Sequence, residues 1–147
     1  MVEWQRGSNG FVSDDAVIGG NDVNGERIFV GRVHHGGDLI PGKIVPSHGV
    51  LYVPYAGDEH SHREYEFLVK PNYGDYMWTN TADGDVPGNA VMGGNTSDGE
   101  NLFIGRAFYE GSWVVGKVHP SHRVLYVPFG GKEVSISDYE ILCVRYD

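Results

Sequence analysis

Residues 46–54 read Pro-Ser-His-Gly-Val-Leu-Tyr-Val-Pro, and residues 120–128 read Pro-Ser-His-Arg-Val-Leu-Tyr-Val-Pro. Outward from this pair, at a constant offset of 74 positions, residues 16–69 correspond to residues 90–143 without a gap. Two copies of one module therefore occupy nearly the whole sequence and leave no length within it for a separate catalytic domain. Because a solenoid needs at least three stacked units, two copies predict one compact domain with internal pseudo-twofold symmetry.

The expected domain spans residues 1–147 and consists of repeat 1 at residues 1–74 and repeat 2 at residues 75–147. Each repeat alone is close to the size at which a hydrophobic core becomes marginal, so the two are expected to fold as one unit. The formal net charge is −9, with 20 acidic and 11 basic side chains and no basic run. Such a charge disfavours nucleic acid and anionic membrane surfaces as partners.

The single cysteine and the N-terminal sequence bear on the compartment. Cys143 lies in an apolar run, where a buried, unreactive thiol is expected, and one cysteine cannot form an internal disulfide. The sequence shows neither a signal peptide nor an apolar stretch of membrane-spanning length. These features predict a cytoplasmic protein without membrane insertion, which would reach outside ligands only by non-classical release.

The residue pattern predicts strands. Runs rich in β-branched and aromatic residues, bounded by Gly, Pro, Asn and Asp, lie at 27–33, 39–45, 50–55 and 64–69 and again 74 positions later. The 22 glycines and 7 prolines interrupt every helical pattern, so helices should be absent or very short. The predicted fold class is therefore all-β, with two pseudo-symmetric antiparallel modules packed as one domain.

The connections between strands carry their own signals. The dipeptides Asn24-Gly25 and Asp98-Gly99 are typical of hairpin turns in which both residues favour positive φ. Residues 71–89 are predicted to form the linker between the repeats, with Trp78 packed against the domain.

Two shared motifs resemble functional sites but favour plainer interpretations. Residues 37–43 and 111–117 match the start of a P-loop, but an aliphatic residue follows each lysine where Mg²⁺ binding needs Ser or Thr, and no helix is predicted to follow. The Ser-His pairs at 47–48 and 121–122 do not make a triad on their own. A turn in which serine and histidine bond to local backbone is preferred.

A third motif could supply half of a metal site. The segment His60-Ser61-His62 places two imidazoles on one face of a strand. Repeat 2 has Val134 and Ile136 at these positions, and no third ligand lies within a recognised spacing. Ordinary surface histidines are therefore favoured, and no metal or other cofactor is expected.

A polar pair beside glycines is the main candidate for binding. Asp22 follows the Gly-Gly pair at 19–20, and Lys43 follows Gly42. In a sheet protein, glycines often mark where a ligand can approach the backbone. A carboxylate that accepts hydrogen bonds and an ammonium that donates them suit a neutral ligand with adjacent hydroxyls. The chemistry alone favours the alternative, a surface salt bridge worth less than about 1 kcal/mol.

The order of these motifs resembles that of the DM9 repeat. Each copy contains a Gly-Gly pair, then Phe-Val-Gly-Arg or Phe-Ile-Gly-Arg, then Gly-Lys, then Leu-Tyr-Val-Pro and a closing Tyr-Glu, which is similar to the small tandem DM9 lectins of invertebrates. The resemblance implies an all-β domain of two pseudo-symmetric halves that associates into a homodimer. It also implies calcium-independent recognition of terminal mannose, serving pattern recognition of microbial glycans in innate immunity.

The resemblance further implies which residues bind the sugar. The family's aspartate after the Gly-Gly element corresponds to Asp22, and the lysine of its Pro-Gly-Lys element corresponds to Lys43. Repeat 2 keeps the lysine as Lys117 but has Thr96 in place of the aspartate, with Asp98 nearby as a substitute acceptor. Because a hydroxyl accepts weaker hydrogen bonds than a carboxylate, repeat 2 is expected to hold the weaker site.

Two other functions remain as alternatives. A non-catalytic DM9 scaffold that binds a protein partner would use the same surface, with Asp22 and Lys43 as an exposed salt bridge. An enzyme such as a glycosidase needs two positioned carboxylates. The acids shared by both repeats, such as Glu59 and Glu133, lie within or beside strand-like runs and give no sign of such a pair, so no enzymatic activity is expected. Retention on immobilised mannose distinguishes the lectin from the scaffold.

Overall fold

The structure is a computed structural model that describes residues 2–146, and in this range the chain is almost entirely β-strand. The strands of repeat 1 are β1 (Glu3–Ser8), β2 (Ile18–Asn21), β3 (Arg27–His35), β4 (Asp38–Val45), β5 (Val50–Tyr55), β6 (Asp58–His62) and β7 (Glu64–Val69). Those of repeat 2 are β8 (Asp75–Ala82), β9 (Met92–Asn95), β10 (Asn101–Tyr109), β11 (Ser112–His119), β12 (Val124–Phe129), β13 (Lys132–Ile136) and β14 (Asp138–Arg145). The two helices are single 3₁₀ turns, η1 (Pro46–His48) and η2 (Pro120–His122). The predicted all-β class is confirmed.

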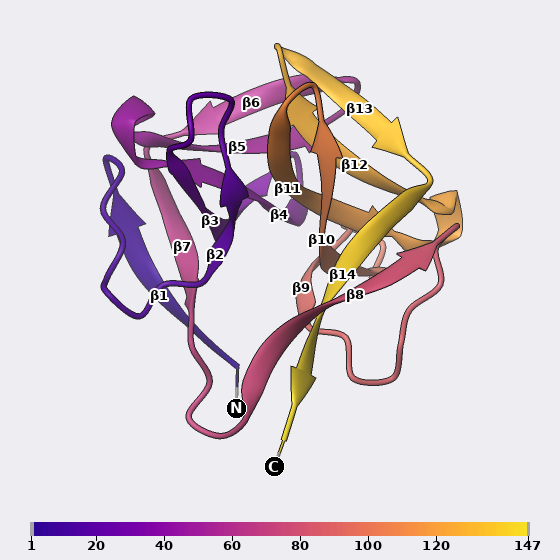
Figure 1. The fold of residues 1–147 in the computed structure, drawn as a ribbon. Helices are drawn as coiled ribbons and strands as arrows, with labels where there is room; N and C mark the ends of the chain where they lie inside the picture. Colours follow the sequence, from indigo (N-terminus) through magenta and orange to yellow (C-terminus); the bar gives the residue numbers. More distant parts are fainter. Residues whose placement is uncertain (1, 147) are drawn as a thin grey trace.

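The two repeats share one continuous sheet. All strand pairs are antiparallel. Three of these pairs join the repeats: β2 with β11, β4 with β9, and β6 with β13. With the β3–β4 and β10–β11 pairings, strands β2, β3, β4, β9, β10 and β11 form a closed ring. Each repeat contributes three consecutive strands to it. Figure 1 shows the halves side by side, with both chain ends on the same side.

The hydrophobic core follows the same symmetry. One buried cluster lies within each repeat, and a third lies between them. The shared cluster consists of Val17, Val30, Leu68, Val91, Ile104, Val115 and Leu142. Because residues of both repeats fill this cluster, each half buries apolar surface that it could not bury alone.

The predicted strands are present, but the sequence pattern missed others. All four predicted runs of repeat 1 and their copies lie in β3, β4, β5, β7 and the equivalent strands. Strands β1 and β2 and their counterparts were not predicted, and β6 was considered only as the strand that would carry His60 and His62. The predicted linker at 71–89 is partly wrong, because β8 lies within it and pairs along its whole length with β14. These strands are short or polar, and their partners, rather than their own patterns, specify them.

The Gly-Gly pairs serve the contact between repeats. A Cβ atom on Gly20 would lie 2.3 Å from the carbonyl oxygen of Trp113, and one on Gly94 would lie 1.9 Å from that of Leu39. Only glycine lets β2 approach β11, and β9 approach β4, this closely. The close backbone approach expected at Gly19 and Gly20 is therefore made by the other repeat rather than by a ligand.

The hairpin turns differ in detail from the prediction. Gly25 and Gly99 have φ values of 89° and 96°, whereas Asn24 and Asp98 do not have positive φ. The amide of Gly25 donates to the carbonyl of Asp22 at 2.9 Å. The positive φ is thus confined to the glycine, as in longer hairpin loops built on a type I turn.

Three smaller predictions concern burial and membranes. Cys143 is fully buried, as expected for an unreactive core thiol. Trp78 packs against the cluster shared by the two repeats. No helix within residues 2–146 has the length and apolar character needed to cross a bilayer.

Candidate functional site

Lys43 lies in a buried position between aromatic rings of both repeats. It stands on β4 opposite Tyr52 of β5, and its side chain is only 7% exposed. Its ammonium nitrogen lies 5.6 Å from the ring centroid of Tyr52 and 5.2 Å from that of Phe129. Phe129 belongs to β12 of repeat 2, so residues from both repeats line this candidate site.

Glu59 of β6 is the anionic partner of Lys43. One carboxylate oxygen lies 3.8 Å from the lysine Nζ, and the other accepts a hydrogen bond from the amide of Gly131 at 3.0 Å. The amide of Glu59 in turn donates to the Gly131 carbonyl at 3.0 Å. Phe129 therefore lines the site with its ring, and the turn that follows it holds the carboxylate of Glu59 in place.

The second copy repeats this arrangement with the roles of the repeats exchanged. Lys117 lies 3.1 Å from a carboxylate oxygen of Glu133, and its Nζ lies 5.3 Å from the ring centroid of Tyr126 and 5.6 Å from that of Tyr55. The amide of Gly57, in repeat 1, donates to Glu133 at 2.9 Å. Each repeat thus completes the site of the other.

The glycine before each lysine has a steric reason. A Cβ atom on Gly42 would lie 2.1 Å from the carbonyl oxygen of Tyr52, and one on Gly116 would lie 1.9 Å from that of Tyr126. Both contacts are closer than any real Cβ makes, so a side chain there would displace the neighbouring strand. The Gly-Lys motif therefore brings lysine close to the neighbouring aromatic strand.

Asp22 lies near Lys43 without forming its ion pair. Burial lowers the pKa of Lys43, and the negative charges of Glu59 and Asp22 oppose this by raising it. Asp22 is half-buried in the β2–β3 turn and accepts a hydrogen bond from the amide of Val23 at 2.9 Å. The ion pair considered from sequence, Asp22 with Lys43, is therefore replaced by Glu59 with Lys43, and Asp22 adds a second negative charge to the site.

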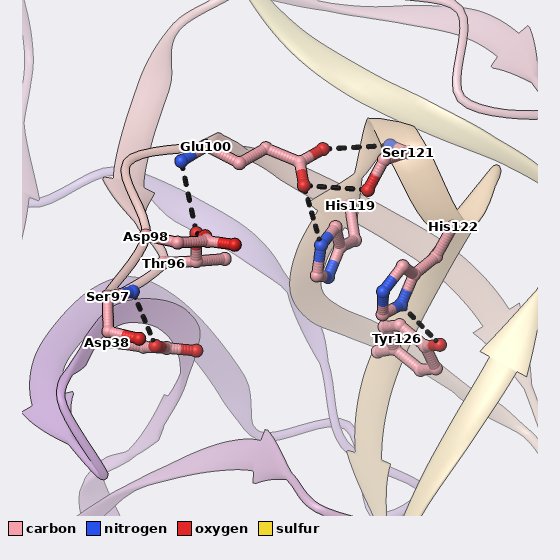
Figure 2. A network of polar contacts seen from close by, with 9 residues as sticks. All are labelled: Asp38, Thr96, Ser97, Asp98, Glu100, His119, Ser121, His122 and Tyr126. Carbon is pink, nitrogen blue, oxygen red and sulfur yellow. Dashed lines mark hydrogen bonds and ion pairs between the residues drawn. The ribbon is translucent and has the colours of Figure 1, made fainter.

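Repeat 2 differs at the position of Asp22. The Thr96 hydroxyl donates to the carboxylate of Asp98 and accepts from the amide of Glu100 at 3.0 Å, as Figure 2 shows. The hydrogen bond from Thr96 lowers the pKa of Asp98, and the charge of His119 also contributes to this shift. Thr96 and Asp98, the two acceptors that could replace the aspartate of repeat 1, thus form hydrogen bonds within their own loop.

A histidine network further distinguishes repeat 2. His119 stands where repeat 1 has Val45, and its Nε2 lies 3.0 Å from Glu100. Its ring stacks on that of His122, with centroids 3.5 Å apart. Burial lowers the pKa of His119, as does the charge of His122. The His119–His122 stack lies beside Glu100 and Tyr126 in Figure 2, so the surroundings of Lys117 differ from those of Lys43.

The turn role predicted for the Ser-His pairs is correct, but their bonding partners differ. Both pairs lie in the single-turn helices η1 and η2. The hydroxyl of Ser47 and its backbone amide both donate to the carboxylate of Glu26, and His48 Nδ1 lies 2.8 Å from the hydroxyl of Tyr52. These side chains thus bind other side chains, and His48 positions the tyrosine that lines the Lys43 site.

Sequence reasoning missed four residues of these sites. Glu59 and Glu133 were noticed as acids shared by both repeats, but their lysine partners were not identified. Tyr55 and Phe129, whose rings line the two sites, were not identified as site residues. One signal was available in the sequence: both copies have a glutamate five positions after Leu-Tyr-Val-Pro. An acidic residue at equivalent positions of both repeats is compatible with the same ion pair in each repeat.

Two symmetry-related hollows compete with the lysine sites as binding surfaces. One, of about 570 Å³, lies beside Arg32 and Glu66, and its counterpart of about 310 Å³ lies beside Arg106. Arg32 contacts Glu66 at 2.7 Å and stacks 4.0 Å above the ring of Trp4. Arg106 donates across the repeats to the carbonyl of Gly19 at 3.0 Å. These guanidinium groups hold the fold together, whereas each lysine ammonium keeps donors for a ligand.

The comparison with protein families agrees with this duplicated architecture. The DM9 repeat profile matches residues 1–62 and 22–136. The chain belongs to the DM9 repeat family. Among DM9-related chains, it is 30% identical to Natterin-4 of Thalassophryne nattereri over 147 residues, which covers 99% of this chain and 35% of Natterin-4. It is 33% identical to Natterin-3 of the same organism over 94 residues, which covers 63% of this chain and 23% of Natterin-3.

The DM9 chain thus spans about a third of the length of Natterin-4. Its fold is also similar to the crystal structure of the nematode sperm cell motility protein MFP2B, with a TM-score of 0.77 and 15% identity. That match covers 100% of this chain and 47% of MFP2B. At this identity the likeness concerns the fold alone.

Proposed function

We propose that this DM9 protein is a lectin that binds terminal mannose at the Lys43 site. The observation that carries the proposal is the buried Lys43–Glu59 pair, 3.8 Å apart, beside aromatic rings from both repeats. Burying a charged lysine is unfavourable unless its donors find partners. An ammonium has three donors, so the ion pair with Glu59 leaves donors available to a hydroxylated ligand.

The chemistry of the surrounding groups matches a sugar. Adjacent hydroxyls of mannose would donate to the carboxylates of Asp22 and Glu59 and accept from Lys43, since each hydroxyl can do both. The rings of Tyr52 and Phe129 offer apolar surface to the C–H face of the sugar. Hydrogen bonds to ionised groups are roughly twice as strong as neutral ones, which favours the site that contains Asp22 over the one that contains Thr96.

Two unequal sites per chain suit the recognition of glycan-coated surfaces. A site of this kind binds one sugar weakly, and linking sites raises the apparent affinity without new contacts. We propose that Lys117 forms the weaker site and that the chain acts as a homodimer in the recognition of microbial glycans. Asp98 and Thr96 add little to this second site because they hydrogen-bond to each other.

We propose binding without catalysis. A glycosidase needs one carboxyl group that can protonate the leaving group and a second that acts on the other face of the sugar. Glu59 is committed on one oxygen to the amide of Gly131 and on the other to Lys43. A carboxylate held in this way is suited to accepting hydrogen bonds from a bound sugar.

Mannose binding is expected to survive chelation. The proposed contacts come from an ammonium and carboxylates, and no group of three or more potential metal ligands with suitable geometry occurs in residues 2–146. Retention on mannose-agarose should therefore be equal with and without EDTA. Loss of retention on chelation, restored by Ca²⁺, would place the sugar at a different, calcium-dependent site. No retention under either condition would favour a scaffold that binds a protein partner.

A further inference from the structure

Three imidazoles of repeat 1 gather next to Tyr55. His35 lies at the end of β3, while His60 and His62 share one face of β6. The Nδ1 atom of His35 lies 2.9 Å from Nε2 of His62, and the ring centroids of His35 and His60 are 4.3 Å apart. All three side chains are half-buried. The fold thus adds the third histidine, His35, that sequence spacing did not reveal.

Repeat 2 shows that packing does not require these histidines. The equivalent residues are Tyr109, Val134 and Ile136, and all three pack against the apolar core of that repeat. Tyr109 meets Phe129 edge-on, with ring centroids 5.2 Å apart. His35 meets Tyr55 in the same way at 5.0 Å. Since the same backbone holds an apolar cluster in repeat 2, the imidazoles of repeat 1 need a reason other than packing.

The environment of the cluster disfavours protonation of His35 and His62. Burial lowers the pKa of His35, with further lowering from the charges of His60 and Lys117. Burial also lowers the pKa of His62, as do His35 and His60. For His35 and His62 these lowered pKa values favour the neutral imidazole, which is the form that binds metals. Asp38, paired with His35 across the hairpin, directs its carboxylate away, to the amide of Ser97 at 2.8 Å.

We propose that His35 and His62, with His60 beside them, bind one divalent transition-metal ion of the kind that imidazole prefers, such as Zn²⁺. The 2.9 Å contact between His35 Nδ1 and His62 Nε2 is a hydrogen bond, which an ion bound between the two rings would replace. Two nitrogens bound to one tetrahedral Zn²⁺ ion, each at about 2.0–2.1 Å, are about 3.3 Å apart. The two rings would therefore need to separate by only a few tenths of an ångström to hold an ion.

His60 would supply the third ligand after its ring turns. Its Nε2 atom now donates a hydrogen bond to the carbonyl oxygen of Tyr55 at 3.1 Å. The structure therefore shows neighbouring imidazoles rather than a preformed set of three ligands, and residues 2–146 contain no such set. Water would complete the coordination shell.

Calorimetric titration of the full chain with ZnCl₂ at pH 7.5 tests this site. We expect one ion per chain, with binding that weakens at pH 5.5 because protonated imidazoles cannot coordinate. The variant His35→Tyr/His60→Val/His62→Ile carries the residues of repeat 2 at these positions. Since loss of even an outer-shell partner lowers metal affinity roughly 10- to 100-fold, this variant should bind Zn²⁺ at least about 10-fold more weakly.

Two matched controls locate the ion. His34→Phe also introduces the residue of repeat 2 but alters an exposed histidine next to the cluster, and His119→Val introduces the residue of repeat 1 into the other histidine network. Both should bind Zn²⁺ like the wild type, and circular dichroism should show that the triple variant keeps the fold. Absence of Zn²⁺ binding by the wild type, unchanged binding by a folded triple variant, or loss of binding in His119→Val would each overturn the proposal.

Discussion

Replacing Lys43 by alanine is expected to lower the affinity for methyl α-mannoside more than any other single change. The ammonium is the central donor of the proposed site, and hydrogen bonds to charged groups contribute about 1.5–3 kcal/mol. Losing this contribution corresponds to roughly a 10- to 150-fold weaker affinity. Titration calorimetry of the wild type and the variant measures this change directly.

Two further variants separate binding from folding. Asp22→Asn keeps the size of a half-buried turn side chain and removes only its charge, so it should weaken mannose binding without changing the thermal midpoint. Lys117→Ala removes the equivalent lysine from the repeat that has Thr96 in place of the aspartate and should weaken binding less than Lys43→Ala. Equal losses in the two lysine variants would show that the sites are equivalent and that Asp22 does not decide their difference.

The Gly116→Ala variant is expected to show the largest loss of stability. The added Cβ would lie 1.9 Å from the carbonyl oxygen of Tyr126 and 2.9 Å from the Cα of Val127. These are backbone atoms fixed in the β11–β12 ladder, so relief requires the two strands to move apart. Overpacking typically costs about 1–3 kcal/mol and occasionally more. With the clash on backbone, we expect about 3 kcal/mol or more, measured by urea unfolding.

Gly88→Ala is the matched control for this variant. A Cβ at Gly88 would meet no atom within 4 Å, so the urea midpoint should stay close to that of the wild type. If Gly116→Ala were as stable as Gly88→Ala, the close approach of β11 and β12 would not restrict this position. The explanation given for the Gly-Lys motif would then fail.

The duplication made the fold predictable, whereas the pairing between repeats was not. Each repeat predicts strands through its own apolar pattern, as at residues 50–55. Strand β6, with the sequence Asp-Glu-His-Ser-His, carries no such pattern and is ordered by its pairing with β5. The contact of Gly20 with Trp113 joins two segments far apart in sequence, and no local propensity encodes it.

The candidate site was also predictable only in part, from the motifs within each repeat. Lys43 and Asp22 stand in recognisable motifs beside glycines, so sequence reasoning found them. Glu59 lies on the second strand from Lys43, and only the register of β4, β5 and β6 brings the two side chains together. Phe129 reaches the site through the packing of one repeat on the other. Such a site becomes visible only when the arrangement of both repeats is known.

The central claim is that residues of both repeats form one mannose site around Lys43. Titration of the ¹⁵N-labelled protein with methyl α-mannoside, followed by amide chemical shifts, tests it most directly. The account predicts that Lys43 and Glu59 of repeat 1 shift together with Phe129 and Gly131 of repeat 2, along one common binding curve. Shifts confined to the hollows beside Arg32 and Arg106, or no shifts at saturating sugar, would contradict it.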